Sequence, residues 1–184
     1  MWFNICTVVE DDFKNLPAIL EGIKQNIIPH KKNTMWWIIT KNAAGVKVVM
    51  ETLAGTVGYA PPATFEIIGF PIVIMPANGD PRNTFLNACN HGYVYFCDAD
   101  NYPHPFLLKD LKHQLYGPSY KVNCVSISDE SFKPDEAYLG QYILSRYDID
   151  AARFTLNDDF ISLVRKGNNI VHFKESRSFY RKNS

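Results

Sequence analysis

The sequence has no long hydrophobic run and no excess of either charge, and its first residues do not resemble a signal peptide. No apolar stretch approaches the ~20 residues of a membrane-spanning helix, and residues 1–10 lack the basic region that begins a signal peptide. Lys plus Arg and Asp plus Glu both number 19, so no surplus of cations is available to neutralise a polyanion such as duplex DNA. We therefore expect a protein with no transmembrane segment and no nucleic-acid partner.

Paired metal-binding or redox cysteines are also absent. The chain has four scattered cysteines, Cys6, Cys89, Cys97 and Cys124. No two of them have the short spacing of a zinc knuckle or a redox motif, and the five histidines show no paired metal-ligand spacing. Three of the cysteines lie in or beside apolar runs, which is typical of buried free thiols in a reducing compartment. This composition predicts a cytoplasmic protein.

One stretch dominates the middle of the chain. Residues 93–97 (YVYFC) predict a strand that is buried on both faces, and Asp98 and Asp100 follow it directly. In open α/β sheets, ligands bind beyond the carboxyl ends of the strands. Two carboxylates at such an edge are costly to desolvate without a cation, and a hard divalent cation can also hold a diphosphate. The alternative is a solvated acidic turn.

Strands and helices alternate through residue 128. Strands are predicted at 3–9, 35–40, 65–68, 72–75, 93–97, 121–128, 141–145 and 169–173. Helices are predicted at 15–27, 43–53, 81–90, 105–116 and 158–167, and a loop at 55–62. This alternation predicts an α/β fold with three layers, α/β/α, around a mostly parallel central sheet. The length suits one domain.

Residues 78–105 (NGDPRNTFLNACNHGYVYFCDADNYPHP) resemble the core of glycosyltransferases with the A-type fold, close to family 2. Those enzymes have a glycine-containing loop with an Arg-Asn pair, a helix ending in Ala and a small residue, and a hydrophobic strand ending in Asp-x-Asp. The same order is found here in Gly79, Arg82, Asn83, Ala88, Gly92 and Asp98-Ala99-Asp100. Residues 4–26, 140–154 and 157–170 resemble further parts of the family, so the resemblance covers most of the chain.

The resemblance implies a fold and an activity. The fold would be that of the nucleotide-diphospho-sugar transferases, as a single domain over 1–184. Residues 1–100 would form the nucleotide-sugar-binding half, and residues 101–184 the acceptor-side half with a basic tail. The activity would be metal-dependent transfer of a sugar from a nucleotide-diphosphate donor to the hydroxyl of a glycan, lipid or protein acceptor, with inversion. Mn²⁺ or Mg²⁺ would stabilise the leaving diphosphate as a Lewis acid.

Particular residues take roles by the same resemblance. Asp100 would ligate the metal, Asp98 would hold the ribose and in some relatives the metal, and His172 would be a third metal ligand. The alternative for His172 is an ordinary strand histidine. The nucleotide site would include Arg82, Asn83, Asp11 and Glu10, although these residues could also be solvated polar residues of a helix start and a loop.

The acceptor side needs a base as well. An inverting enzyme deprotonates the acceptor hydroxyl with a carboxylate opposite the leaving group. By resemblance to the family's acceptor-side helix, Asp159 would be that base, with Asp158 as the second candidate. Acids in the first turn of a helix also stabilise its dipole without any catalytic role, so this alternative stays open.

Two features depart from the family's pattern. Thr40-Lys41-Asn42 follows the second predicted strand, where the family has acidic residues that grip the nucleotide, and Asp158 replaces the usual Glu. The chain is also shorter than most such enzymes, so a non-catalytic nucleotide-sugar-binding module is a second reading. A haloacid-dehalogenase-type phosphohydrolase is less consistent with the sequence, because that family places its Asp-x-Asp near the N-terminus. A nucleotidyltransferase lacks support because the chain has no Gly-rich N-terminal loop.

The tail from residue 165 to residue 184 is basic. It contains six Lys or Arg residues and one acid, Glu175. The sequence leaves three roles open for it: a basic lid over a diphosphate, a solvated terminus, or a peripheral contact with anionic lipid.

Overall fold

An eight-stranded sheet organises the molecule. The computed structural model describes residues 2–27, 33–57, 64–67, 70–97, 99, 101–102, 124–126, 142–146, 170–172 and 181–182. The strand order in the sheet is β3-β4-β2-β1-β5-β8-β7-β9. The strands are β1 Phe3–Val9, β2 Thr34–Thr40, β3 Thr64–Ile67, β4 Phe70–Pro76, β5 Tyr93–Phe96, β7 Cys124–Ser126, β8 Tyr142–Ser145 and β9 Ile170–His172. A separate two-stranded sheet pairs β6 (Asn101–Tyr102) with β10 (Arg181–Lys182).

The centre of the large sheet is parallel. Strands β4, β2, β1 and β5 are neighbours in that order and run in the same direction. Val9 is in register with Thr40, and Thr40 with Pro76, so three of these strands end in one row. Antiparallel pairs lie outside this centre, β3 beside β4 and β8 beside both β5 and β7. The mostly parallel sheet expected from the alternating elements is confirmed.

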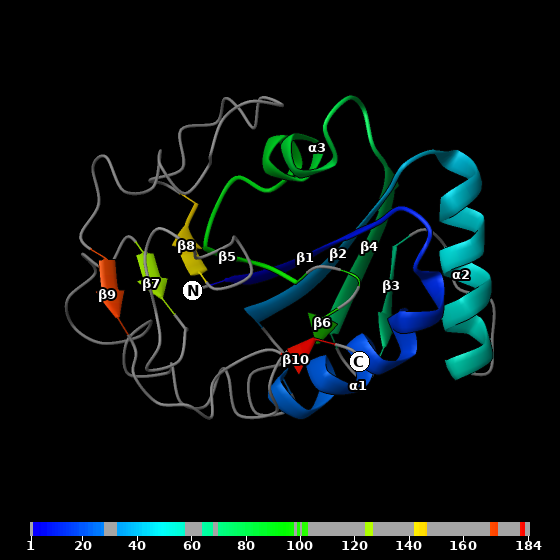
Figure 1. Ribbon diagram of the computed structural model, residues 1–184, viewed down its shortest axis with the longest axis horizontal. Coiled ribbons are helices and arrows are strands. Elements are labelled where there is room, and N and C mark those ends of the chain that lie inside the picture. Colours follow the sequence, from blue (N-terminus) through cyan, green and yellow to red (C-terminus); the bar gives the residue numbers. More distant parts are fainter. Residues whose placement is uncertain are drawn as a thin grey trace.

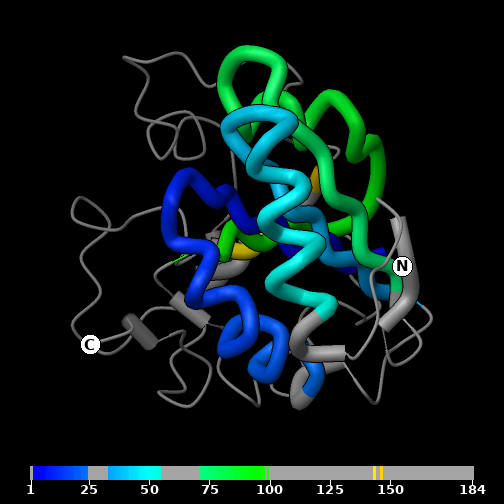
Figure 2. Tube along the Cα trace, turned by 90° about the vertical axis from the view of Figure 1, so that its right-hand side faces the viewer, coloured from blue at the N-terminus to red at the C-terminus, as the bar shows by residue number. Residues whose placement is uncertain are grey.

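Helices cover both faces of the parallel centre. Helices α1 (Leu16–Ile27) and α2 (Ala43–Val57) lie together on one face, and the shorter α3 (Pro81–Ala88) lies on the other. Figure 2 shows α1 and α2 side by side in front of the strands. A short 3-10 helix, Phe13–Asn15, joins β1 to α1. This arrangement gives the three layers that the sequence predicts.

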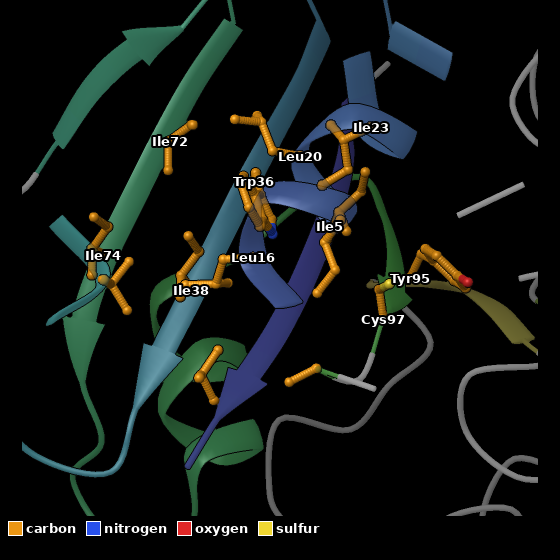
Figure 3. Packing of buried hydrophobic residues seen from close by; sticks show 14 of the residues in the cluster. Ile5, Leu16, Leu20, Ile23, Trp36, Ile38, Ile72, Ile74, Tyr95 and Cys97 are labelled. Carbon is orange, nitrogen blue, oxygen red and sulfur yellow. The ribbon is translucent and has the colours of Figure 1, made fainter. Parts of the chain in front are cut away.

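The larger part of the core lies between the sheet and α1 with α2. Leucine and isoleucine side chains of α1, including Leu16, Leu20 and Ile23, face the strands at helical spacing (Figure 3). Opposite them, Ile5 of β1 and Trp36 of β2 are in register and fully buried. The Trp36 indole nitrogen donates to Thr7 Oγ1 at 3.0 Å, so its polar atom is satisfied inside the core.

The other face packs against α3 through aromatic rings. Phe85 of α3 makes edge-to-face contacts with Trp37 of β2 and Phe96 of β5, both with ring centroids 5.6 Å apart. The Trp37 indole donates to the side chain of the buried Asn4 at 3.1 Å. The adjacent tryptophans therefore face opposite sides of the sheet, as alternation along a strand requires.

One detail differs from the sequence expectations. Helix α2 continues to Val57, so Gly55 lies inside a helix and not in the predicted loop. The predicted helices at 105–116 and 158–167 lie outside the described residues. Among the described helices, none has both the length and the apolar character required to cross a membrane.

Candidate nucleotide-binding edge

The carboxyl ends of the parallel strands form one edge of the sheet, with a topological switch point between β1 and β5. From β1 the chain moves outward on one side through β2 and β4, and β5 then pairs on the other side of β1. The order of the strands therefore reverses direction at the boundary between β1 and β5. In sheets of this class, ligands bind outside the carboxyl ends of the strands at such a point.

The predicted carboxylate pair follows β5 in the sequence. The Cys97 amide donates to the Cys6 carbonyl at 2.8 Å, which holds the end of β5 against β1. Ala99 is buried, with 7% of its surface exposed. Asp98 and Asp100 themselves lie outside the described residues. Within the described part of the chain, no three His, Cys, Asp or Glu residues gather as a metal site.

The loop after β1 carries the predicted ribose or base contacts. Glu10 and Asp11 follow Val9 directly and are both exposed. Because β1 and β5 are adjacent and parallel, this loop begins at the same edge of the sheet at which β5 ends. The structure therefore brings two of the predicted nucleotide-site residues to the edge where the carboxylate pair emerges.

The loop after β2 contains residues that cap helix α2. Asn42 Oδ1 accepts a hydrogen bond from the Gly45 amide at 3.0 Å, so Asn42 caps the start of α2. Thr40 Oγ1 donates to the Asn42 carbonyl at 2.8 Å. Lys41 between them is exposed. Thr40 and Asn42, two of the three residues at the position of the family's acidic residues, thus stabilise the start of α2. Lys41 is the charged residue of this loop.

The loop after β4 is held by side chains of α3. Asp80 caps the helix by accepting from the Asn83 amide at 3.0 Å, and Pro81 takes the first helical position. Thr84 Oγ1 accepts from the Asn78 amide at 2.8 Å and is buried. Gly79 turns the loop with φ +81°. The glycine-containing loop is therefore a rigid turn built around Thr84.

Arg82 and Asn83 lie in the first turn of α3 and are half-buried. The backbone amide of Asn83 donates to Asp80 Oδ1, so Asn83 helps to fix the start of the helix. The loop of which they are part begins at the end of β4, two strands from β1. Their predicted contact with a nucleotide stays a prediction.

His172 is farther away along the sheet. It ends β9, and Ser126 of β7 is its register partner. Strands β8 and β7 lie between β9 and β5, so the separation is three strand spacings, or about 14 Å. The sheet does not place His172 beside β5, and its role as a metal ligand stays a prediction. Asp158 and Asp159 lie outside the described residues.

A buried arginine that the sequence did not single out anchors the approach to β5. Arg146 follows β8, and its guanidinium donates to the carbonyls of Leu86 at 2.7 Å and Cys89 at 2.6 Å. A cation at these last carbonyls suits the negative end of the α3 dipole. The nearest sequence signal was an Arg directly after an apolar strand, which is too common to be decisive.

Comparison with solved structures identifies the fold. The chain superposes on S. aureus TarS 1-349 with a TM-score of 0.68 at 12% identity, over 98% of this chain and 60% of that one. It also superposes on the mannosyltransferase PcManGT of Pyrobaculum calidifontis with a TM-score of 0.63 at 12% identity, over 94% of this chain and 55% of that one. The chain has the A-type glycosyltransferase fold.

A third neighbour with this fold is glucosyl-3-phosphoglycerate synthase from Mycobacterium tuberculosis. Its TM-score is 0.54 at 12% identity, over 100% of this chain and 71% of that one. No protein-family profile and no curated protein matches the sequence. The chain spans about 60% of the length of TarS 1-349, so it matches part of that protein.

Ligands are recorded in several of these neighbours. A TarS structure contains UDP-GlcNAc, the mannosyltransferase contains GDP-Man and Mn²⁺, and the synthase contains Mn²⁺, UDP and phosphoglyceric acid. The A-type glycosyltransferase fold is thus shared with proteins that hold a nucleotide or a nucleotide sugar.

Proposed function

We propose that this chain is a metal-dependent glycosyltransferase that takes a sugar from a nucleotide-diphosphate donor. The observation that supports this best is the switch point between β1 and β5. The exposed acids Glu10 and Asp11 follow β1, and β5, which precedes Asp98 in the sequence, ends at the same edge of the sheet. The neighbours with UDP-GlcNAc, GDP-Man and Mn²⁺ favour a nucleotide sugar as the ligand.

The donor set fits a divalent cation. Asp98 and Asp100 directly follow a fully buried strand and offer carboxylate oxygens, which Mn²⁺ and Mg²⁺ accept as ligands. When bound, such a cation would stabilise the charge that develops on the leaving diphosphate. Asp100 would hold it, with Asp98 shared between the ribose and the metal, and His172 would join only if the chain around β9 approaches β5.

The transfer itself needs a base for the acceptor hydroxyl. We assign this role to Asp159, with Asp158 as the second candidate, and inversion of the anomeric centre follows from a base opposite the leaving group. The acceptor is a hydroxyl of a glycan, lipid or protein. Arg82 and Asn83 would support the nucleotide from the start of α3.

Ligand-induced stabilisation tests the donor site. A ligand at a hundred times its Kd adds about 2.7 kcal/mol to folding stability, which for a chain of this size raises Tm by roughly 5–10 °C. We expect one nucleotide family among UDP-, GDP-, CMP- and dTDP-sugars to raise Tm with Mn²⁺ and not with EDTA. Asp100→Asn should abolish the metal-dependent part, with Glu51→Gln on the exposed side of α2 as a matched control.

The same experiment separates the alternatives. Stabilisation without donor hydrolysis or transfer would indicate a non-catalytic binding module. No stabilisation by any donor would contradict the proposal and favour phosphate-ester hydrolysis as the next activity to assay.

A further inference from the structure

Lys41 lies at the carboxyl edge of the sheet, directly after β2. Thr40 ends β2 and is in register with Val9, which ends the parallel strand β1. Glu10 and Lys41 therefore occupy equivalent positions, one residue beyond this pair. Figure 1 shows the loops after β1 and β2 leaving the sheet at the same end. An acid and a base thus follow neighbouring strand ends, whose backbones are roughly 5 Å apart.

The backbone around Lys41 is held on both sides. Thr40 Oγ1 donates to the Asn42 carbonyl at 2.8 Å, so a hydrogen bond spans Lys41. The Thr40 carbonyl accepts the Ala77 amide at 2.7 Å, which joins this end of β2 to the chain after β4. A Cβ added to Gly45 of α2 would lie 2.9 Å from Thr40 Cβ, so α2 begins directly against the end of β2. Lys41 is therefore presented from a fixed point, which lowers the entropy cost of binding through it.

Glu10 and Lys41 offer opposite hydrogen-bonding groups to a ligand. Both side chains are exposed, and no ion pair joins Glu10 to Lys41. Thr40 Oγ1 and Asn42 Oδ1 in the same loop are used at the start of α2. A lysine ammonium only donates hydrogen bonds, and an ionised carboxylate only accepts them. A ligand at this edge therefore meets Lys41 as a donor and Glu10 as an acceptor.

The strand order determines which part of a nucleotide reaches Lys41. Strand β1 lies between β2 and β5, so the ends of β2 and β5 are two strand spacings, or roughly 10 Å, apart. The proposed function puts the diphosphate beyond β5. On the other side of β5 lies the antiparallel β8, so the row of carboxyl ends continues toward β1 and β2. A nucleoside that extends along this row brings the far side of its base to Lys41.

The bases differ in what they present on that side. Uracil and guanine carry a carbonyl oxygen next to a ring N–H, whereas cytosine and adenine carry an amino group next to a ring nitrogen acceptor. In a pyrimidine, this exocyclic group is opposite the glycosidic nitrogen and is therefore the group farthest from the ribose. A carbonyl there suits the donor Lys41, and the adjacent N–H suits the acceptor Glu10. An amino group there would face the ammonium with no acceptor.

We propose that Lys41 is a specificity-determining residue, which selects a donor with a keto base, uracil or guanine, by donating to the carbonyl oxygen of that base. Glu10 accepts the adjacent ring N–H. This inference rests on the proposed function and deepens it, because it names the class of nucleotide that binds at the same edge. It predicts that replacing Lys41 changes the preference between bases and not only the overall affinity.

Matched pairs of nucleoside diphosphates test this preference. UDP and CDP differ only at the ring positions that would face Lys41 and Glu10, and so do inosine diphosphate (IDP) and ADP. These four and GDP would be titrated by calorimetry in Mn²⁺ into wild type, Lys41→Met and Lys41→Glu. The matched control is Lys47→Met, which removes the same charge from an 80% exposed side chain on α2. Melting curves without ligand would show that each variant is folded.

We expect the ratio of affinities within a pair to change. Wild type should bind the keto member about tenfold or more tightly than the amino member, as for a hydrogen bond to a charged group. Lys41→Met should lower this ratio about fivefold or more, because the donor is lost. Lys41→Glu should lower it further, because a carboxylate accepts from the amino group. Lys47→Met should keep the wild-type ratio.

The outcomes distinguish this inference from the proposed function. If wild type binds none of the five diphosphates, both are wrong. If wild type binds CDP or ADP as tightly as its keto counterpart, or if Lys41→Met keeps the wild-type ratio, the donor site stands and the role of Lys41 is wrong. An equal loss of affinity for both members of a pair also overturns this role, because the ratio is unchanged. If Lys41→Glu fails to fold, Lys41→Met decides.

Discussion

Gly92 lies where the chain enters β5, and its backbone is packed too closely for any side chain. Its φ is +88°, and an added Cβ would lie 2.3 Å from the Trp2 carbonyl oxygen. That oxygen accepts the Tyr93 amide, and the Gly92 carbonyl accepts the Arg146 amide, both at 2.8 Å. The contact cannot open without loss of hydrogen bonds on both sides, so the position requires glycine.

Two glycine variants distinguish the energetic cost of a positive φ from the additional cost of a steric clash. Gly79→Ala should cost about 1–2 kcal/mol of unfolding free energy, because Gly79 has φ +81° but open space around its Cα. Gly92→Ala should cost on the order of 4 kcal/mol or more, because a clash is added. Urea unfolding measures both values. Equal costs for the two variants would show that the Trp2 contact yields easily.

Cys89 makes stability sensitive to alkaline pH. Burial raises the pKa of its thiol above the ordinary value of 9.0, and the positive charge of Arg146 offsets part of this. A raised folded-state pKa means that the unfolded chain loses its proton first. The contribution of the protonated Cys89 thiol to folding stability is therefore complete below pH 9.0, and it is lost as pH rises from there through the folded-state pKa.

Cys89→Ala should therefore flatten the alkaline part of the stability curve. The urea midpoint of wild type should fall between pH 9 and pH 10.5 more steeply than that of the variant, whatever constant offset the lost side chain adds. The other cysteines are present in both proteins and cancel in the comparison. Identical slopes would contradict the assignment of this pKa shift to Cys89.

At the scale of elements, α3 is fixed at both ends by side chains. Asp80 caps its start, and Thr84 holds the loop before it. Arg146 holds its last carbonyls and belongs to the segment after β8, so the antiparallel part of the sheet is coupled to α3. Because α3 leads through Gly92 into β5, Arg146 positions the strand that ends at the carboxylate pair.

Replacing Arg146 should destabilise the fold. Arg146→Met keeps much of the volume but removes the donors to Leu86 and Cys89. Since a buried carbonyl without a partner costs about 1–3 kcal/mol, we expect a loss of roughly 2–5 kcal/mol. Arg146→Lys keeps the charge near the helix end and should lose less. Thermal unfolding would measure both variants, and an equal loss would show that the positive charge alone does not replace the two hydrogen bonds of the guanidinium.

Most elements were predictable because their signals are local. Leu16, Ile19 and Ile23 repeat at helical spacing, and residues 93–97 form one apolar run, so α1 and β5 fall where expected. Gly55 and Thr56 lack such a pattern, yet α2 continues past them to Val57. A single glycine lowers the stability of a helix by only about 1 kcal/mol relative to alanine, so it does not by itself end the helix.

The candidate site was predictable only in part, because some of its contacts join distant parts of the chain. The positions of Glu10 and Asp11 follow from the end of a strand, which is visible in the sequence. The contacts of Arg146 and the pairing of Lys182 with Asn101 join residues far apart in the chain. No periodic pattern marks such contacts, because a two-residue strand and a single arginine have no period.

At the scale of the whole molecule, we propose that the donor and acceptor sides lie at different parts of the sheet. The parallel half carries the switch point, and the antiparallel strands β8 and β7 extend the sheet toward β9. The resemblance assigns the acceptor side to the second half of the chain, where Asp158 and Asp159 lie in the sequence. If this division is functional, changes in that half should affect turnover without affecting donor binding.

Asp159→Asn tests that division directly. Loss of a general base lowers turnover by about 10²–10⁴-fold, whereas the affinity for the donor should stay within about twofold, because the amide keeps the size of the side chain and the metal ligands are unchanged. Donor hydrolysis measures turnover without knowledge of the acceptor, and calorimetry measures binding. Asp158→Asn is the matched control. Full activity in Asp159→Asn with loss in Asp158→Asn would move the base to Asp158, and activity in both would remove it from this pair.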